Sequence, residues 1–313
     1  MELTQAAEFF RSHDRFQLVT HRRPDGDTLG SAGALCHALR RMGKTAFLHP
    51  NPEITETYLP FVSPYLALEA ADDAINVAVD VADPGIACLG FQGEIRFWLD
   101  HHLSRNGARE PGVIWHHKSS CGELVLELIE ELLGTPDPEE ANLLYIAVST
   151  DTGCFVYANT NADTHRAAAK VLDAGAELPR INKLLFRTKR RERLALEGMV
   201  YSTLTSLRGG ELNIAVITLD MLRASGVTED DCDDLANLAG QVAGSRVSVT
   251  VRELSADPPG SKVSLRTDGG VDASRVCARF GGGGHKMAAG CELPLPPRET
   301  AEAIRAAVEE VWA

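Results

Sequence analysis

Short apolar runs alternate with longer amphipathic segments along the first 150 residues. Phe16–Thr20, Ile75–Val79 and Ile95–Leu99 are apolar runs of the kind that is buried in parallel sheets. Between the first two runs, apolar residues from 29 to 42 follow a helical period that ends at Gly43. This alternation predicts an α/β domain with a mostly parallel sheet flanked by helices.

Two further helices are predicted before residue 150. Ser120-Cys121-Gly122-Glu123 has the pattern of a capping box, in which each of the two polar side chains accepts from the other residue's backbone N–H. The helix that it opens ends at Gly134, and Pro138–Val148 is also predicted to be helical.

The second half of the chain has a different pattern. Residues 160–205 are mostly polar and predicted to be helical. A smaller unit follows, with predicted strands at Leu212–Leu219, Arg246–Leu254 and Lys262–Arg266 and a final amphipathic helix at 298–312. The predicted domains are therefore residues 1–190 and 206–313, joined by a linker at 191–205. A basic run near this boundary is either a solvated helix face or a contribution to anion attraction: Arg187, Lys189, Arg190, Arg191 and Arg193.

Length and charge narrow the choice of function. The 313 residues are 44% hydrophobic and exceed what one compact core usually spans, which agrees with two domains. The net charge of −13 disfavours binding to long nucleic acid but allows a local cation cluster for a small anion. The seven cysteines are scattered, so free thiols are expected. Because no signal-like start and no long apolar stretch occurs, a cytoplasmic protein without a membrane partner is predicted.

Asp and His residues gather where predicted strands and one helix end. The clusters are His21-Arg-Arg-Pro-Asp25-Gly-Asp27, Asp80, Asp100-His101-His102 and Asp151. Each cluster alone is most simply a helix cap or a turn. Parallel strands, however, end at one edge of a sheet, where ligands bind, so three of the clusters converge there. The four clusters together favour a functional site.

The residue types in these clusters indicate metal ions. Several carboxylates can share one site only when cations neutralise them. Imidazole and carboxylate without thiolate suit Mn²⁺, with Mg²⁺ or Co²⁺ as alternatives, better than a structural zinc site. Two such ions about 3.5–4 Å apart, bridged by a carboxylate, can polarise a phosphoryl group and convert a bridging water to hydroxide.

These clusters resemble the four motifs of the DHH phosphoesterases without departure. Phe280-Gly-Gly-Gly-Gly-His285-Lys-Met-Ala-Ala-Gly290 resembles the signature of their C-terminal DHHA1 domain, so the likeness covers almost the whole chain. It implies an active site in the cleft between a DHH domain and a smaller α/β DHHA1 domain. The NrnA-like subgroup is the most similar: these enzymes hydrolyse very short RNA and dephosphorylate 3′-phosphoadenosine 5′-phosphate. Some relatives instead act on linear or cyclic dinucleotides.

The resemblance implies a ligand set for each of two Mn²⁺ ions, with Asp80 bridging them. One set is His21, Asp25 and Asp80. The other set is Asp27, Asp80, His101 and Asp151. The resemblance also places His102 opposite the scissile phosphate as a catalytic residue. Asp100 is then expected behind the histidines, where a carboxylate can fix an imidazole tautomer.

By the same resemblance, the second domain holds the nucleotide's base and terminal phosphate. Consecutive glycines let the backbone approach an anion, although a flexible linker also explains a glycine run. The implied substrate contacts are Asn106, Arg246, Arg252, Arg266, Gly281, Gly282, Gly283, Gly284 and His285. The partners implied are short RNA or small nucleotides. The preferred substrate, the polarity of cleavage, the native metal and the oligomeric state, a homodimer included, stay open.

Three other functions compete with this interpretation. A manganese-dependent inorganic pyrophosphatase carries the same N-terminal motifs but lacks the glycine–histidine signature. A single-strand exonuclease of the RecJ kind is expected to be longer and more basic. A non-catalytic nucleotide sensor on this fold is expected to have lost metal ligands, and here all are present.

Overall fold

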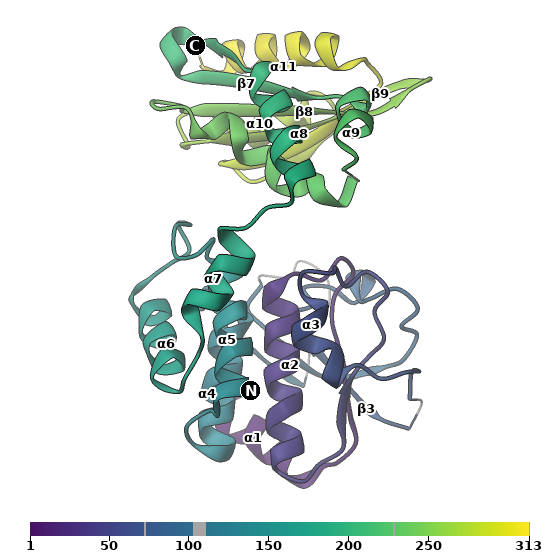
Figure 1. The fold of residues 1–313 in the computed structure, drawn as a ribbon, viewed down its shortest axis with the longest axis vertical. Coiled ribbons are helices and arrows are strands. Elements are labelled where there is room, and N and C mark those ends of the chain that lie inside the picture. Colours follow the sequence, from purple (N-terminus) through teal and green to yellow (C-terminus); the bar gives the residue numbers. More distant parts are fainter. Residues whose placement is uncertain (72, 103–110, 228, 313) are drawn as a thin grey trace. The chain divides into compact units, whose positions relative to one another are not determined.

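The computed structural model describes residues 1–71, 73–102, 111–227 and 229–312, with only the backbone described at 229–234. The chain forms two compact units, Met1–Thr188 and Lys189–Ala313 (Figure 1). Each unit has its own sheet and its own hydrophobic core.

The sheet of the N-terminal unit consists of five strands in the order β2-β1-β3-β4-β5, and every neighbouring pair is parallel. The strands are β1 (Phe16–Val19), β2 (Ala46–Leu48), β3 (Ile75–Val79), β4 (Ile95–Asp100) and β5 (Gly112–Ile114). The predicted parallel α/β fold is thereby confirmed. The direction of winding reverses between β1 and β3, and the carboxyl ends of strands beside such a reversal are where open α/β sheets bind ligands.

Seven α-helices lie in the described part of this unit, and several of them cover one face of the sheet (Figure 1). They are α1 (Leu3–Ser12), α2 (Gly26–Arg41), α3 (Leu59–Val62), α4 (Cys121–Leu133), α5 (Pro138–Asp151), α6 (Ala162–Asp173) and α7 (Leu178–Phe186). Apolar side chains of α1, α2, α4 and α5 form one core with alternate residues of the strands. Their burial supplies the main stabilisation of the unit.

Helices α2 and α5 pack unusually closely and antiparallel to each other. A Cβ atom added at Gly30 in α2 lies only 2.4 Å from the carbonyl oxygen of Leu143, so a larger side chain does not fit there. A Cβ atom at Gly26 similarly meets Thr150, near the end of α5. The start of α2 therefore lies beside the end of α5, and this brings Asp27 and Asp151 to the same place.

The cap of α4 differs from the predicted capping box. Ser120 accepts from the backbone N–H of Glu123 at 3.3 Å, as predicted. The Glu123 carboxylate, however, accepts from the N–H of Ser119 at 3.3 Å, one residue before the cap, so the reciprocal bond of the motif is displaced. The helix still begins at Cys121 because the bond that satisfies its first turn is kept.

The C-terminal unit has a mixed sheet in the order β10-β11-β9-β8-β7-β6, in which only β7 and β8 are parallel neighbours. Its strands are β6 (Thr205–Leu207), β7 (Leu212–Ile217), β8 (Val247–Ala256), β9 (Pro259–Thr267), β10 (Gly283–Gly284) and β11 (Ala288–Leu293). Helix α11 (Pro297–Trp312) and the short α10 (Ala273–Ala278) pack on one core of this sheet.

Residues 191–205, predicted to be helical and to link the two domains, are mostly helical in the structure. They form α8 (Arg191–Ser202), whose Leu196 and Val200 are fully buried against β7 and the 219–241 region, which contains α9 (Leu219–Ser225) and a 3₁₀-helical stretch at Glu229–Gln241. Leu196 and Val200 are four residues apart, so they lie on the same face of α8, and this face packs into a hydrophobic core. The two compact units divide between Thr188 and Lys189.

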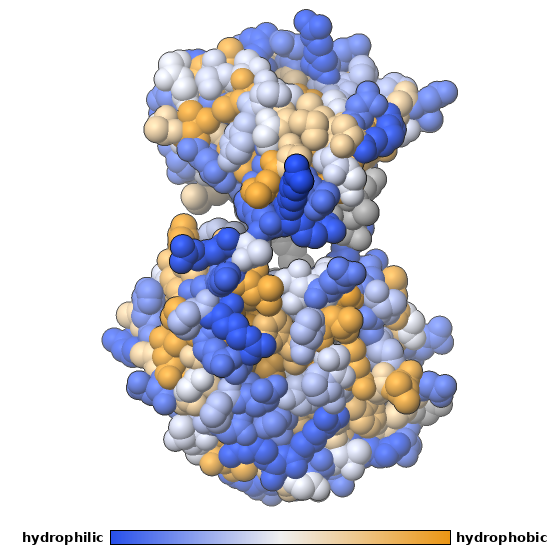
Figure 2. Space-filling view, viewed as in Figure 1, coloured by the Kyte–Doolittle hydropathy of each residue, from blue (hydrophilic) through white to orange (hydrophobic). Residues whose placement is uncertain are grey.

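Hydrophobic side chains on the surface are scattered among hydrophilic ones on the face shown in Figure 2. No helix in the described part of the chain is both long and apolar enough to cross a membrane. The six cysteines with described side chains are all free thiols.

Candidate metal centre

The fold brings all the predicted metal ligands to one edge of the N-terminal sheet. His21 follows β1, Asp80 follows β3, and His101 follows β4, so all three lie at the carboxyl ends of parallel strands. Asp25 and Asp27 come from the start of α2, and Asp151 is the last residue of α5. The sites of β1 and β3 flank the reversal of strand order, where the edge is open to a ligand.

His21, Asp25 and Asp80 form the first cluster. The Nε2 atom of His21 lies 3.6 Å from Asp25 Oδ1 and 3.8 Å from Asp80 Oδ2. The Nδ1 atom of the same ring lies 2.8 Å from the backbone carbonyl of Arg22, to which it can only donate. Donation from Nδ1 leaves a lone pair on Nε2, which is the form that binds a metal ion.

Asp27, His101 and Asp151 form the second cluster. The Nε2 atom of His101 lies 3.5 Å from Asp27 Oδ2, 3.5 Å from Asp80 Oδ1 and 3.8 Å from Asp151 Oδ2. Its Nδ1 donates to the carbonyl of Lys118 at 3.2 Å, so here too Nε2 faces the carboxylates. Asp80 therefore turns one oxygen toward each cluster.

Two buried atoms at the junction have no hydrogen-bond partner among the described residues. They are His101 Nε2 and Asp80 Oδ1. Buried polar atoms are almost always satisfied, because leaving one unpaired costs about 1–3 kcal/mol. Both atoms are Lewis bases that point toward each other, and a divalent cation satisfies both at once. The residues present thus fit a metal ion.

Asp27 is held rigidly by the start of α4. The backbone N–H groups of Cys121 and Gly122 donate to its two oxygens at 2.7 and 2.9 Å, and the Ser31 hydroxyl adds a bond of 3.1 Å. A helix N-terminus favours a negative charge in this position. The carboxylate is only 1% exposed, so its position is fixed before any ligand arrives.

The carboxylates of the centre repel one another. Burial, together with the charges of Asp80 and Asp151, raises the pKa of Asp27 well above its usual value. Burial raises the pKa of Asp151 to about 6; His101 opposes this rise and Asp80 adds to it. A cation that neutralises the group relieves this repulsion.

Asp80 has a backbone conformation that is rare outside glycine. Its φ is +59°, in the left-handed region, and its N–H donates to the carbonyl of Leu99 at 2.8 Å. Such a conformation costs of order 1–3 kcal/mol and persists only when the surroundings enforce it. Here it accompanies a side chain that reaches both clusters.

His102 and Asp100 form a pair beside the centre. Asp100 Oδ1 accepts from His102 Nδ1 at 2.9 Å and from the backbone N–H groups of His101 and His102. Asp100 therefore orients the ring of His102, while the ring of His101 is oriented by the Lys118 carbonyl. His102 Nδ1 also lies 3.4 Å from Asp80 Oδ1, and the side chain is 45% exposed. The neighbouring Asp80 carboxylate raises the pKa of His102, and burial opposes the rise.

Two supporting groups were not predicted. Asn159 Nδ2 donates to the Asp151 carbonyl and to the Ser119 carbonyl, both at 3.1 Å, and lies 3.4 Å from Asp151 Oδ2. The Lys118 carbonyl orients His101. A backbone carbonyl has no residue-type signature, and Asn159 stands in a loop whose path the local sequence pattern does not indicate.

The predicted substrate contacts are dispersed in the C-terminal unit. Arg266 is paired in register with Ala288, and the His285 N–H donates to the Ala288 carbonyl at 2.7 Å, so these residues share one end of the sheet. Arg252 pairs with Lys262. Lys262 is four residues before Arg266 on β9, so Arg252 lies roughly 13 Å from that end of the sheet at about 3.3 Å per residue. Asn106 lies outside the described residues.

Arg246 interacts mainly with its own unit. Its Nε donates to Asp268 Oδ2 at 2.8 Å, its Nη1 lies 3.5 Å from Glu211 Oε1, and its guanidinium lies over the ring of Trp312. These contacts neutralise much of its charge. Its contact with a substrate therefore stays a prediction.

The glycine run has a structural requirement of its own. Gly281 and Gly284 have φ of +75° and +144°, and a Cβ atom on Gly282 lies 2.2 Å from the carbonyl oxygen of Gly290. The run is therefore not a flexible linker, because its last two residues form β10 and pair with β11. The exposed His285 follows directly.

Comparisons with known proteins agree with this arrangement. The sequence pattern of the DHH family, N-terminal domain, matches residues 15–148, and that of the DHHA1 domain matches residues 211–313. The chain is 35% identical over 284 residues to the bifunctional oligoribonuclease and PAP phosphatase NrnA of Thermus thermophilus, covering 88% of this chain and 83% of that protein. It is 24% identical to the Bacillus subtilis protein of the same name, covering 90% of each chain.

A solved structure shows the same fold. It is an exopolyphosphatase-related protein from Bacteroides fragilis, with a TM-score of 0.85 and 22% identity, covering 98% of this chain and 95% of that chain.

Proposed function

Since the chain belongs to the DHH phosphoesterases that carry a DHHA1 domain, we propose that it hydrolyses short oligoribonucleotides and 3′-phosphoadenosine 5′-phosphate. In this role it acts as an exoribonuclease on very short RNA and as a 3′(2′),5′-bisphosphate nucleotidase. The observation that carries the proposal is the convergence of two histidines and four aspartates at one sheet edge, together with the 35% identity to an enzyme of that name.

The proposed metal ligands divide into two sets that share Asp80. His21, Asp25 and Asp80 are proposed to hold one ion. Asp27, Asp80, His101 and Asp151 are proposed to hold the other. Oxygen and imidazole donors favour Mn²⁺, with Mg²⁺ or Co²⁺ as alternatives. When bound, such ions polarise a phosphoryl group and lower the pKa of a bound water.

The protein's own contribution to the chemistry centres on His102. Asp100 engages its Nδ1 at 2.9 Å, which fixes the ring and its tautomer and assigns proton transfer to Nε2. The half-exposed position supports contact with the scissile phosphate or its leaving oxygen. We assign His102 the role of general acid and stabiliser of charge in the transition state.

The C-terminal unit is proposed to hold the substrate's base and terminal phosphate. Arg266 and His285 lie at the same end of its sheet as the glycine turn, and this supports their joint use. A substrate of about two to five nucleotides is proposed, because an acidic protein gains few phosphate contacts from a longer strand.

A turnover panel tests the proposal. The full chain is stripped of metal, given Mn²⁺, Mg²⁺ or Co²⁺, and assayed with RNA of 2, 5 and 24 nucleotides, 3′-phosphoadenosine 5′-phosphate, linear and cyclic diadenosine dinucleotides, and pyrophosphate. Fast turnover of the two shorter RNAs and of 3′-phosphoadenosine 5′-phosphate is expected. Preference for the 24-mer supports a general exonuclease instead, and preference for a diadenosine dinucleotide supports a dinucleotide phosphodiesterase. Metal binding without turnover of any substrate supports a nucleotide sensor.

A further inference from the structure

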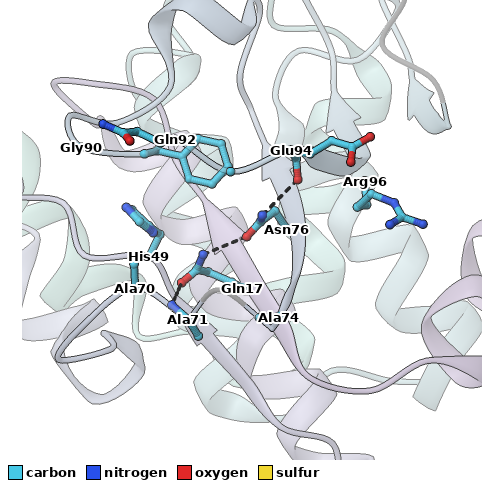
Figure 3. A pocket seen from close by; sticks show the side chains of 12 residues that line it. Gln17, His49, Ala70, Ala71, Ala74, Asn76, Gly90, Gln92, Glu94 and Arg96 are labelled. Atoms are coloured by element: carbon cyan, nitrogen blue, oxygen red, sulfur yellow. Dashed lines mark hydrogen bonds between the residues drawn. The ribbon is translucent and has the colours of Figure 1, made fainter.

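A polar pocket of about 420 Å³ lies in the N-terminal unit, and none of the residues that line it is a candidate metal ligand. Figure 3 shows Gln17 and Asn76 between His49 at one end and Glu94 and Arg96 at the other. Gln17, Asn76 and Arg96 are each the second residue of a strand, β1, β3 and β4, whereas the metal ligands follow the strands' carboxyl ends. The volume falls within the range of small-molecule sites.

The pocket lies on the sheet face opposite the helical core. Phe16, Leu18, Val77 and Phe97 belong to that core, and side chains alternate along a strand, so Gln17 and its neighbours face the other way. Irregular segments cover this second face, and the lining includes residues 70–71 and 90–94. Both faces of a parallel sheet are normally apolar, so polar residues here need an explanation.

The two amides have a structural explanation. Gln17 Nε2 donates to Asn76 Oδ1 at 2.8 Å, Gln17 Oε1 accepts from the Ala71 N–H at 2.9 Å, and Asn76 Nδ2 donates to the Glu94 carbonyl at 3.0 Å. This chain of bonds fastens the covering segments to the sheet. Each NH₂ group still has a second N–H, which can donate to a ligand in the pocket.

His49 has no such explanation. The residue is 5% exposed, and its buried Nδ1 atom has no hydrogen-bond partner among the described residues. Burial lowers the pKa of His49, so the ring is neutral at pH 7, with one N–H donor and one acceptor. Its ring meets the Phe91 ring edge-on at 5.3 Å. A buried imidazole nitrogen that makes no hydrogen bond indicates a partner outside the chain.

Arg96 and Glu94 bring charge to the other end. Both are exposed, and within the described part of the chain Arg96 forms no ion pair or hydrogen bond through its side chain. Gly93 shapes the pocket between the two ends, since a Cβ atom there lies 2.6 Å from Asn76 Nδ2 and 3.1 Å from the Phe91 ring. The pocket thus offers an aromatic ring and neutral polar groups at one end and a guanidinium with a carboxylate at the other.

We propose that this pocket binds a nucleoside monophosphate. The base lies against Phe91 and forms hydrogen bonds with His49 and with the second amide N–H groups of Gln17 and Asn76. These groups match the hydrogen-bond donors and acceptors of a heterocyclic base. The ribose hydroxyls donate to Glu94, and the phosphate pairs with Arg96, whose guanidinium matches phosphate geometry. Free phosphate alone satisfies only Arg96, and an apolar ligand satisfies neither end. The pocket shares no residue with the candidate metal centre, so the proposal does not rest on the proposed reaction.

Calorimetry on the metal-stripped full chain tests the proposal, because stripping removes any ions that would hold phosphate at the candidate metal centre. AMP, adenosine and inorganic phosphate are titrated into the wild type and three variants. Arg96→Gln removes the cation, and Ala70→Trp fills the pocket from an exposed lining position. Arg298→Gln is the matched control, since it makes the same change at an exposed arginine of the C-terminal unit.

AMP is expected to bind saturably, and Arg96→Gln and Ala70→Trp are each expected to weaken it about tenfold or more, with no effect of Arg298→Gln. Adenosine and phosphate are each expected to bind more weakly than AMP. Photo-crosslinking with 8-azidoadenosine monophosphate is expected to label residues 90–96. The proposal is overturned by absence of binding, by phosphate or adenosine binding as tightly as AMP, by pocket variants without effect, or by labelling confined to residues 281–285.

Discussion

The N-terminal unit holds two groups of histidine and carboxylate side chains, and among the described residues one group has an arginine partner whereas the other has none. One is the candidate metal centre around Asp80 and His101; the other consists of His37, Asp137 and Glu140. In the second group, Arg41 Nη1 donates to Glu140 at 2.6 Å, and its Nε lies 3.5 Å from Asp137. Both nitrogens of His37 are also engaged, by Tyr65 at 2.9 Å and Asp137 at 3.0 Å.

The metal centre lacks such a partner. Among the described residues, no lysine or arginine forms an ion pair with Asp27, Asp80 or Asp151. Burial and neighbouring carboxylates raise the pKa of Asp27. Burial also acts to raise the pKa of Asp137, but a hydrogen bond from the Glu140 backbone and the interaction with His37 lower it overall. Residue type alone therefore does not distinguish the two groups, whereas an internal cation does: it is present in the second group and absent from the described surroundings of the first.

The largest effect is expected from Asp80→Asn. One residue serves both clusters, so losing its charge removes ligands from both ions, and kcat is expected to fall about 10⁴-fold or more with loss of bound metal. Kinetics and elemental analysis measure the two effects. Asp137→Asn is the matched control: asparagine also caps a helix, and metal content and rate are expected to stay unchanged. If Asp80→Asn keeps two bound metals and a normal rate, the two-metal mechanism is contradicted.

His101 and His102 are expected to give different signatures. His101→Ala is expected to lose a metal, because Nε2 faces three carboxylates at the centre. His102→Ala is expected to keep both metals while kcat falls about 10²–10⁴-fold, because its proposed role is proton transfer and charge stabilisation. Native mass spectrometry beside kinetics separates the two. The reverse pattern means that the roles are exchanged.

Much of this centre could be predicted from the sequence because parallel strands impose a common edge. Once 16–20, 75–79 and 95–99 were assigned as strands, the residues that follow them had to meet. The contribution of Asp151 follows less directly. It depends on the close antiparallel packing of α2 and α5, which Gly30 permits and which no local pattern reports.

Other features could not be predicted for physical reasons. The strands β2 and β5 have three residues each, too few for a periodic pattern to show. Residues 191–205 are predicted to be helical, but their polar composition does not indicate burial, and two apolar positions, Leu196 and Val200, are enough to bury one face of α8. The internal cation of the second group, Arg41, is 96 residues from Asp137 in sequence and meets it only through the fold.

The response of stability to metal is expected to depend on pH. The raised pKa values of Asp27 and Asp151 mean that the folded, metal-free chain holds protons more tightly than the unfolded chain. The stabilisation that these bound protons give the folded chain is complete below the pKa of an aspartate in the unfolded chain, about 4. For Asp151 it is lost as the pH rises through about 6. Asp25, whose pKa is lowered overall although burial opposes this, works in the other direction.

Metal ions compete with those protons, so the gain in Tm on adding Mn²⁺ is expected to be larger at pH 8 than at pH 5.5. At about 100-fold excess over Kd the gain in stability is about 2.7 kcal/mol, or about 5–10 °C for a unit of this size. Thermal scans of metal-stripped and Mn²⁺-loaded protein at both pH values measure it. A gain that shrinks with rising pH contradicts the assignment of these carboxylates as ligands.

The smallest effect is expected from Arg41→Met, which removes the internal cation from the second group and makes it resemble the first. Glu140 is fully buried and then has no cation, whereas the Arg41 side chain is 33% exposed, so water screens part of the lost attraction. The expected destabilisation is about 1–2 kcal/mol, below the 3–5 kcal/mol typical of breaking a fully buried pair. Denaturant unfolding of Mn²⁺-loaded protein measures it, and kcat is expected to stay unchanged because the metal centre is intact.

Arg41→Met also tests whether the internal cation takes the place of a metal ion in the second group. If it does, Mn²⁺ is expected to stabilise the Arg41→Met variant weakly, and this stabilisation is expected to persist when Asp80→Asn is added. Wild-type stability in Arg41→Met contradicts the role given to Arg41, and loss of that extra stabilisation in the double variant assigns it to the metal centre.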